Sequence, residues 1–74
     1  MSIKYAVIYE RAAHNWAAYV PDLPGCMTTG STLDETKLNI REAIQGHLDT
    51  LCEFGDPIPE ASSVAGEIEI TTAA

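Results

Sequence analysis

The chain is short of the groups that bind nucleic acid or cross membranes. Its 74 residues include 4 Lys and Arg against 11 Asp and Glu, which gives a net charge of −7. A negative field repels phosphate backbones, so we expect no direct binding of nucleic acid, and a basic protein is the natural partner. No apolar run approaches the ~18 residues of a membrane span, and no N-terminal signal pattern is present. We therefore expect a cytoplasmic protein without membrane contact.

Cysteine and the motifs of enzymes are equally scarce. Cys26 and Cys52 lack metal-ligand spacing, so we interpret both as free thiols rather than as a disulfide. Glycine-rich phosphate loops, H-E-x-x-H and paired C-x-x-C motifs do not occur. We expect His14 to lie in a hairpin loop and His47 on the buried side of a helix, where a histidine held by one hydrogen bond is commoner than a ligand. The sequence thus predicts no metal, no cofactor and no catalytic residue.

A proline-rich segment predicts a chain reversal in the first half of the sequence. Each proline fixes φ near −65° and removes a backbone donor, so the segment cannot lie inside a central strand. Proline followed by glycine suits a type II turn, because glycine accepts a positive φ at the third position. We interpret the segment as a structural motif that orients two strands. Its residues are Pro21, Asp22, Leu23, Pro24, Gly25 and Cys26.

Hydrophobic periodicity predicts strands on both sides of this turn. Residues 3–10 are mostly apolar on both faces, which favours a central strand that is covered on each side. Residues 16–20 and 26–30 complete an antiparallel three-stranded meander. Residues 67–72 alternate charge and isoleucine, which indicates a final strand with one buried face. With one helix between the third and final strands, the expected fold class is α+β, in the order β-β-β-α-β.

The helix itself has clear start and stop signals. Thr32 and Glu35 have the spacing of a capping box, and Gly55 suits a left-handed stop, so we expect one long helix that packs on the sheet and ends near Phe54. The positions expected on its buried side recur at helical spacing. They are Leu33, Thr36, Ile40, Ala43, Ile44, His47, Leu51 and Phe54.

The size of the chain favours self-association. A single domain over residues 1–74 buries only about 60–65% of its unfolded surface, so a monomer would be marginally stable. Leu38 falls on the solvent side of the predicted helix and Leu48 on its flank. Single exposed leucines are usually harmless. These two are also the candidates for a contact between copies of the chain.

Four blocks of sequence occur in an informative order. They read Y-A-V-I-Y-E from residue 5, W-A-A-Y-V-P-D-L-P-G-C from residue 16, T-G-S-T-L-D-E from residue 29 and N-I-R-E-A-I from residue 39. Gly55 and Ile58-Pro59 follow them. Together they resemble the HicB-like antitoxin family of prokaryotic toxin–antitoxin systems, over about three quarters of the chain. The resemblance is strongest in the P-D-L-P-G-C segment.

The resemblance implies a partial RNase H-like fold and a protein partner. That partner is a HicA-type toxin, a small basic RNA-cleaving protein whose active-site histidine the antitoxin covers, and family members often form dimers or tetramers. Many relatives also carry a C-terminal DNA-binding domain, whereas this chain ends two residues after Thr72, so we expect a single HicB-like domain without one. RNase H-type catalysis needs a carboxylate inside the first strand, and here the middle of that strand is Tyr5-Ala6-Val7.

Two functions from different classes stay open, together with a third variant. We favour a binding protein that neutralises a toxin by contact; the alternatives are a metal-dependent nuclease that uses Glu10, Asp22 and Glu42, and an orphan oligomeric interaction module. The expected contact residues are Glu10, Trp16, Tyr19 and Asp22, because acidic groups suit a basic partner and aromatic side chains are enriched at interfaces. Trp16 and Tyr19 alternate along one strand, so we expect at most one of them to be exposed.

Overall fold

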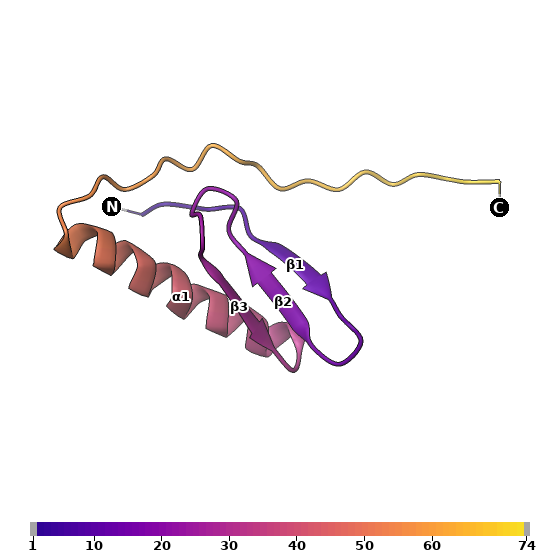
Figure 1. The fold of residues 1–74 in the computed structure, drawn as a ribbon. Coiled ribbons are helices and arrows are strands. Elements are labelled where there is room, and N and C mark those ends of the chain that lie inside the picture. Colours follow the sequence, from indigo (N-terminus) through magenta and orange to yellow (C-terminus); the bar gives the residue numbers. More distant parts are fainter. Residues whose placement is uncertain (1, 74) are drawn as a thin grey trace.

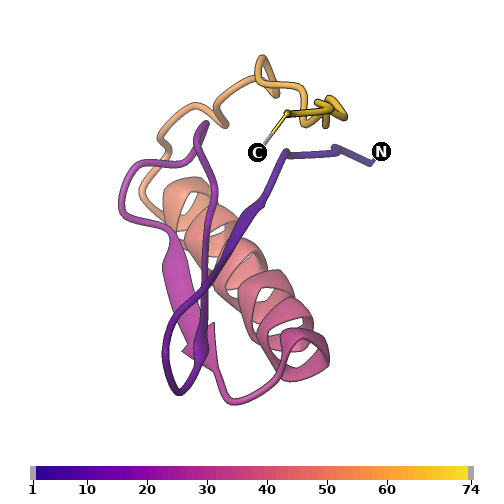
Figure 2. The same ribbon diagram turned by 90° about the vertical axis from the view of Figure 1, so that its right-hand side faces the viewer.

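Residues 2–73 of the computed structural model form a three-stranded sheet and one helix (Figure 1). The strands are β1 (Ile8–Arg11), β2 (Trp16–Tyr19) and β3 (Met27–Gly30), and the helix is α1 (Leu33–Glu53). The strands pair antiparallel in the order β1-β2-β3, so the predicted meander is confirmed. α1 lies across one face of the sheet and packs against β3 and β2 (Figure 2).

The position of the first strand differs from the prediction. β1 begins at Ile8 rather than at residue 3, and it is an edge strand, because β2 lies between the other two. The prediction of a central strand was therefore wrong. The apolar residues that suggested it have another role: Tyr5, Val7 and Tyr9 pack against the core from the side. Apolar side chains can pack against the core from an edge strand as well as from a central one.

The predicted final strand is also wrong. Residues 56–73 form neither helix nor strand, although residues 67–72 carry a clear strand pattern. In Figure 1 this part of the chain runs from the end of α1 over the top of the sheet and ends well beyond β1. Ile68 and Ile70 are 85% and 73% exposed, so the alternation buries no face within this chain. A strand pattern favours extended backbone, but pairing also needs a neighbour that the pattern does not specify.

The proline-rich segment closes as two consecutive turns. The Leu23 N–H donates to the Val20 carbonyl at 3.1 Å, and the Cys26 N–H donates to the Leu23 carbonyl at 3.0 Å. Gly25 has a φ of +82°, as the predicted type II turn requires. A third bond, from the Val20 N–H to the Cys26 carbonyl at 3.1 Å, joins the two ends. The turns direct Leu23 and Cys26 into the core, where they are 0% and 4% exposed.

α1 starts and stops close to the predicted positions. The Thr32 hydroxyl accepts from the Glu35 N–H at 3.1 Å, while the Glu35 carboxylate accepts from the Ser31 N–H at 3.3 Å, one residue before the expected donor. The helix ends at Glu53, and Gly55 has a φ of +72°. Phe54 is 74% exposed, so its predicted burial is wrong. It is the C-cap, where the helical spacing that would bury it no longer applies.

The sheet approaches the helix closely at Gly30. Gly30 is buried, and a Cβ at this position would lie 2.8 Å from the Thr36 backbone nitrogen and even nearer to the Thr36 hydroxyl. Thr36 is fully buried, and its hydroxyl donates to the Thr32 carbonyl at 2.7 Å. The end of β3 therefore lies directly against the first turns of α1, and no side chain fits between them.

Replacement of Gly30 by alanine should destabilise the fold. The added methyl meets backbone as well as side chain, and overpacking of this kind costs about 1–3 kcal/mol. Gly46→Ala is the matched control, because a Cβ there meets nothing within 4 Å in the middle of α1; it should stabilise the protein by about 0.5–1 kcal/mol. Urea denaturation of both variants measures the difference. Equal stability of the two variants would contradict the close packing at Gly30.

Candidate functional site

The face of the sheet opposite α1 carries a row of apolar side chains. Ile8 lies opposite Tyr19 in the β1–β2 register, and Tyr19 lies opposite Met27 in the β2–β3 register. Residues directly opposite each other in an antiparallel sheet share a face, so the three side chains form one row across it. We call Ile8, Tyr19 and Met27 the apolar row. Met27 is 68% exposed and Tyr19 40%, while Ile8 is half-buried.

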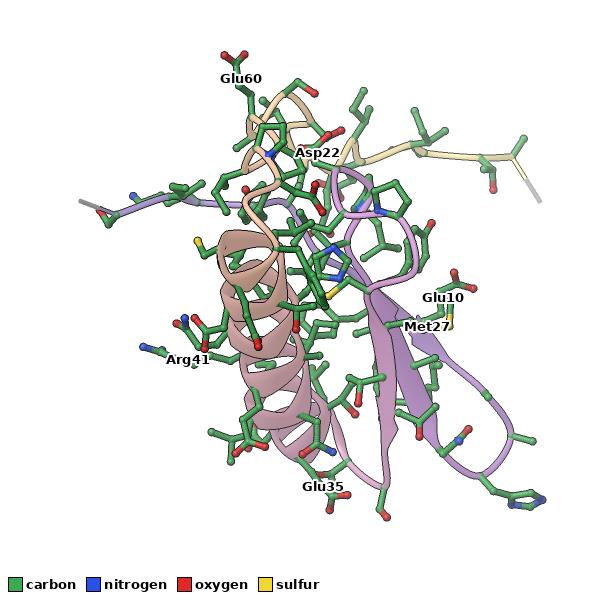
Figure 3. The ribbon with its side chains drawn as sticks, turned by 60° about the vertical axis from the view of Figure 1, so that its left-hand side comes forward. Glu10, Asp22, Met27, Glu35, Arg41 and Glu60 are labelled. Atoms are coloured by element: carbon green, nitrogen blue, oxygen red, sulfur yellow. The ribbon has the colours of Figure 1, made fainter. Side chains whose placement is uncertain are left out.

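A carboxylate lies beside the apolar row. Glu10 is two residues after Ile8 on β1, so its side chain points to the same face. Figure 3 shows the side chains of Glu10 and Met27 on the same side of the molecule, away from α1. The open face therefore combines an exposed thioether, a tyrosine ring and a negative charge.

The predicted contact residues do not all meet on this face. Glu10 and Tyr19 lie on it, but Trp16 belongs to the opposite face, where it pairs with Arg11 on β1 and with Gly30 on β3. The Arg11 guanidinium lies over the Trp16 ring, 6.0 Å from its centre, and the indole is half-buried. The expected alternation of Trp16 and Tyr19 is confirmed, with Tyr19 the exposed member.

Asp22 has a separate role that its position in a turn did not reveal. Its carboxylate accepts four hydrogen bonds of 3.0 Å, from the backbone N–H and the hydroxyl of both Ser62 and Ser63. These serines lie on the connection that follows α1, 40 and 41 residues further along the chain. We call this arrangement the Asp22 latch. A second tie lies nearby, where the Tyr5 hydroxyl donates to the Pro59 carbonyl at 2.5 Å.

The latch lowers the pKa of Asp22 below its ordinary value of 3.8. The largest cause is the hydrogen bond from the Ser63 backbone N–H, and the remaining bonds from the two serines act in the same direction, against desolvation. Because the folded pKa lies below the unfolded one, the latch contributes its full stability above pH 3.8. That stability is lost as the pH falls through the folded pKa.

The Asp22→Asn variant should release the connection from the turn. Asparagine offers one acceptor oxygen and no charge to four donors, so hydrogen exchange at the Ser62 and Ser63 amides should be at least several-fold faster. In the native protein the same protection should decrease as the pH is lowered below 3.8, whereas in the variant it should be low throughout. Protection factors measured by NMR test both effects. Asp56→Asn, at an exposed carboxylate of the same connection, should leave protection unchanged.

Some residues of these sites were not identified from the sequence. Met27 could have been, because it follows the buried Cys26 and must point to the other face of its strand. The pattern around Ile8 predicts a strand covered on both sides, which obscures the place of Ile8 on the open face of the sheet. Ser62 and Ser63 had no signal, since nothing near them in the sequence indicates a partner 40 residues away.

The arrangement does not assemble the groups of the nuclease alternative. Within residues 2–73, no group of three or more His, Cys, Asp and Glu side chains could hold a metal ion, so Glu10, Asp22 and Glu42 are not brought together.

Cys26 and His47 line a shallow cavity of about 290 Å³ between the turn and α1. Both cysteines are free thiols, as predicted, and burial raises the pKa of Cys26, which keeps that thiol protonated rather than nucleophilic.

The two leucines of α1 that are candidates for a contact between copies differ in exposure. Leu38 is 66% exposed, whereas Leu48 is half-buried and packs against the core, so the two candidates for a contact between copies do not lie in equivalent environments. Over the residues that the structure describes, no helix is long and apolar enough to cross a membrane.

These features define a small α+β domain with one covered and one open sheet face. A family model described as the HicB-like antitoxin of bacterial toxin–antitoxin systems matches residues 5–71. The chain therefore belongs to the HicB-like antitoxin family. The family is generally non-catalytic and implies a HicA-type toxin as partner.

Curated relatives support this membership. A UPF0150 protein of Thermoplasma acidophilum is 38% identical over 58 residues, which cover 77% of this chain and 84% of that protein. One from Thermotoga maritima is 37% identical over 65 residues, covering 86% and 83%. An uncharacterised 14.9 kDa protein of Haemophilus phage HP1 is 33% identical over 60 residues, or 81% of this chain, but the match spans only 45% of the phage protein. No solved structure matches the chain significantly.

Proposed function

We propose that this protein is an antitoxin that neutralises a small, basic, mRNA-cleaving toxin of HicA type by direct contact. Family membership over residues 5–71 is the observation that carries the proposal. The net charge of −7 supports it, because it attracts a basic protein and accelerates their encounter. Since mRNA would be the substrate of that toxin, we expect the complex in the cytoplasm.

We place the contact on the apolar row and Glu10. Tyrosine and methionine are enriched in protein interfaces, and methionine adapts its shape to a partner. The opposite face of the sheet packs against α1, so it offers less surface to a toxin. Asp22 contributes little in this assignment, because both of its oxygens are engaged by Ser62 and Ser63.

We further propose that the domain is a partial RNase H-like fold that binds without catalysis. A meander followed by one long helix is compatible with that fold. The middle of the segment that leads into β1 is Tyr5-Ala6-Val7, where catalysis would need a carboxylate. Toxin neutralisation would then depend on surface contact alone.

Removal of the two exposed members of the apolar row should weaken toxin binding. Tyr19→Ala combined with Met27→Ala should raise the Kd by about 10-fold or more, as expected when two interface anchors are truncated. The measurement is calorimetry with a purified HicA-type toxin, together with an mRNA-cleavage assay. Phe54→Ala, at an aromatic side chain that is 74% exposed elsewhere, is the control and should bind normally. Unchanged inhibition by the double variant would move the contact to another face.

Reversal of the charge at Glu10 should slow toxin association. A rim charge acts mainly on the association rate and its salt dependence, so Glu10→Lys should reduce the rate several-fold at low salt and flatten its dependence on salt concentration. Glu42→Lys makes the same change in net charge on the exposed side of α1 and should have a clearly smaller effect. Association rates measured by stopped-flow or surface plasmon resonance distinguish the two variants. Equal effects would mean that only total charge matters.

A further inference from the structure

The last ten described residues form an exposed apolar segment. We call residues 64–73 the C-terminal arm; they adopt no helix or strand and extend beyond the latch. Val64, Ile68 and Ile70 are 93%, 85% and 73% exposed. Three large aliphatic side chains on one short arm expose an apolar surface that is unfavourable in water unless a partner covers it.

An apolar groove lies between α1 and residues 2–9, which lead into β1 and form its first two positions. Its volume is about 670 Å³. The apolar side chains that line it are those of Ile3, Tyr5, Val7, Tyr9, Ile40, Ile44 and Leu48. Lys37 and Arg41 lie on its rim, both exposed, and they are two of the 4 basic residues in the whole chain. Like charges four residues apart on a helix repel each other, so this pair favours an anionic partner.

The arm and the groove are complementary in spacing as well as in chemistry. In an extended chain Glu67 and Glu69 lie ~6.6 Å apart on one side, and Ile68 and Ile70 lie at the same spacing on the other. Four residues along a helix advance the chain by ~6 Å. This is the spacing between Lys37 and Arg41 on the rim, and also between Ile40 and Ile44 in the groove. Ile68 and Ile70 of an arm can therefore enter the groove while the glutamates of the arm meet the two cations on its rim.

We propose that the C-terminal arm of one copy occupies the groove of a second copy. The Asp22 latch and the Tyr5–Pro59 bond fix where the arm leaves the body. From there it passes beside residues 7–9 and, in Figure 1, continues beyond β1 and away from α1. This direction carries Ile68 and Ile70 away from the groove of their own chain. Reciprocal exchange of two arms gives a closed two-fold dimer in which each copy supplies one arm and one groove.

This dimer goes beyond the proposed toxin binding and leaves Tyr19 and Met27, the two exposed members of the apolar row, open. It uses the groove between α1 and residues 2–9, whereas Tyr19 and Met27 lie on the face of the sheet opposite α1. It also adds apolar burial to a chain whose own core is small. Dimerisation is measured on the protein alone, so its outcome is separate from that of the toxin experiments.

Two charge-reversed variants provide the test. One carries Lys37→Glu and Arg41→Glu, and the other carries Glu67→Lys and Glu69→Lys. Each variant alone should be monomeric by light scattering coupled to size-exclusion chromatography, because its arms and rims have the same sign, while the native chain is a dimer. An equimolar mixture should form a heterodimer, since both of its arm–groove pairs again combine opposite charges.

The controls separate the remaining outcomes. Ile68→Asp with Ile70→Asp should give a monomer with an unchanged circular dichroism spectrum, because both side chains lie outside the core. Glu60→Lys, exposed and located before the arm, should leave the dimer intact. A monomeric native chain, dimers of either charge-reversed variant alone, or a mixture that stays monomeric would overturn the proposal. The last result is expected if each arm folds back into its own groove or binds a different protein.

Discussion

The pair of turns between Val20 and Cys26 is the constraint on which the rest of the structure depends. Three backbone hydrogen bonds close it, and its prolines and glycine leave few other conformations. Because Tyr19 and Met27 lie immediately outside it, the closed turn makes them direct partners across β2 and β3, with their side chains on the same face of the sheet. The same turn directs Leu23 into the centre of the core and leaves the Asp22 carboxylate where Ser62 and Ser63 reach it.

The two faces of the sheet have different tasks. One face packs on α1, and the approach there is so close that Gly30 is required opposite Thr36. The other face contributes less to the core, so its residues can be selected for contact with a partner. In a chain of 74 residues this division leaves a small core, and stability has to come from additional ties such as the latch and from association.

The acidic charge is spread over elements with different roles. Glu35 caps α1, Asp22 holds the connection after it, and Glu10 lies on the open face. A net charge of −7 therefore does not mark a single site, although it favours a basic partner as a whole. The few cations have local positions as well, with Arg11 over Trp16 and two others on the groove of α1.

By itself the sequence determined the turns, the strand order of the meander, and the start and stop of α1, because each depends on residues a few positions apart. It also separated Tyr19 from Trp16, since alternation is a local property of a strand. Only the tertiary structure decided that β1 is an edge strand, that residues 67–72 stay unpaired, and that Asp22 binds serines 40 and 41 residues away. A local pattern specifies which way a side chain points along its own strand or helix. The neighbour that it meets is set by how distant parts of the chain pack together.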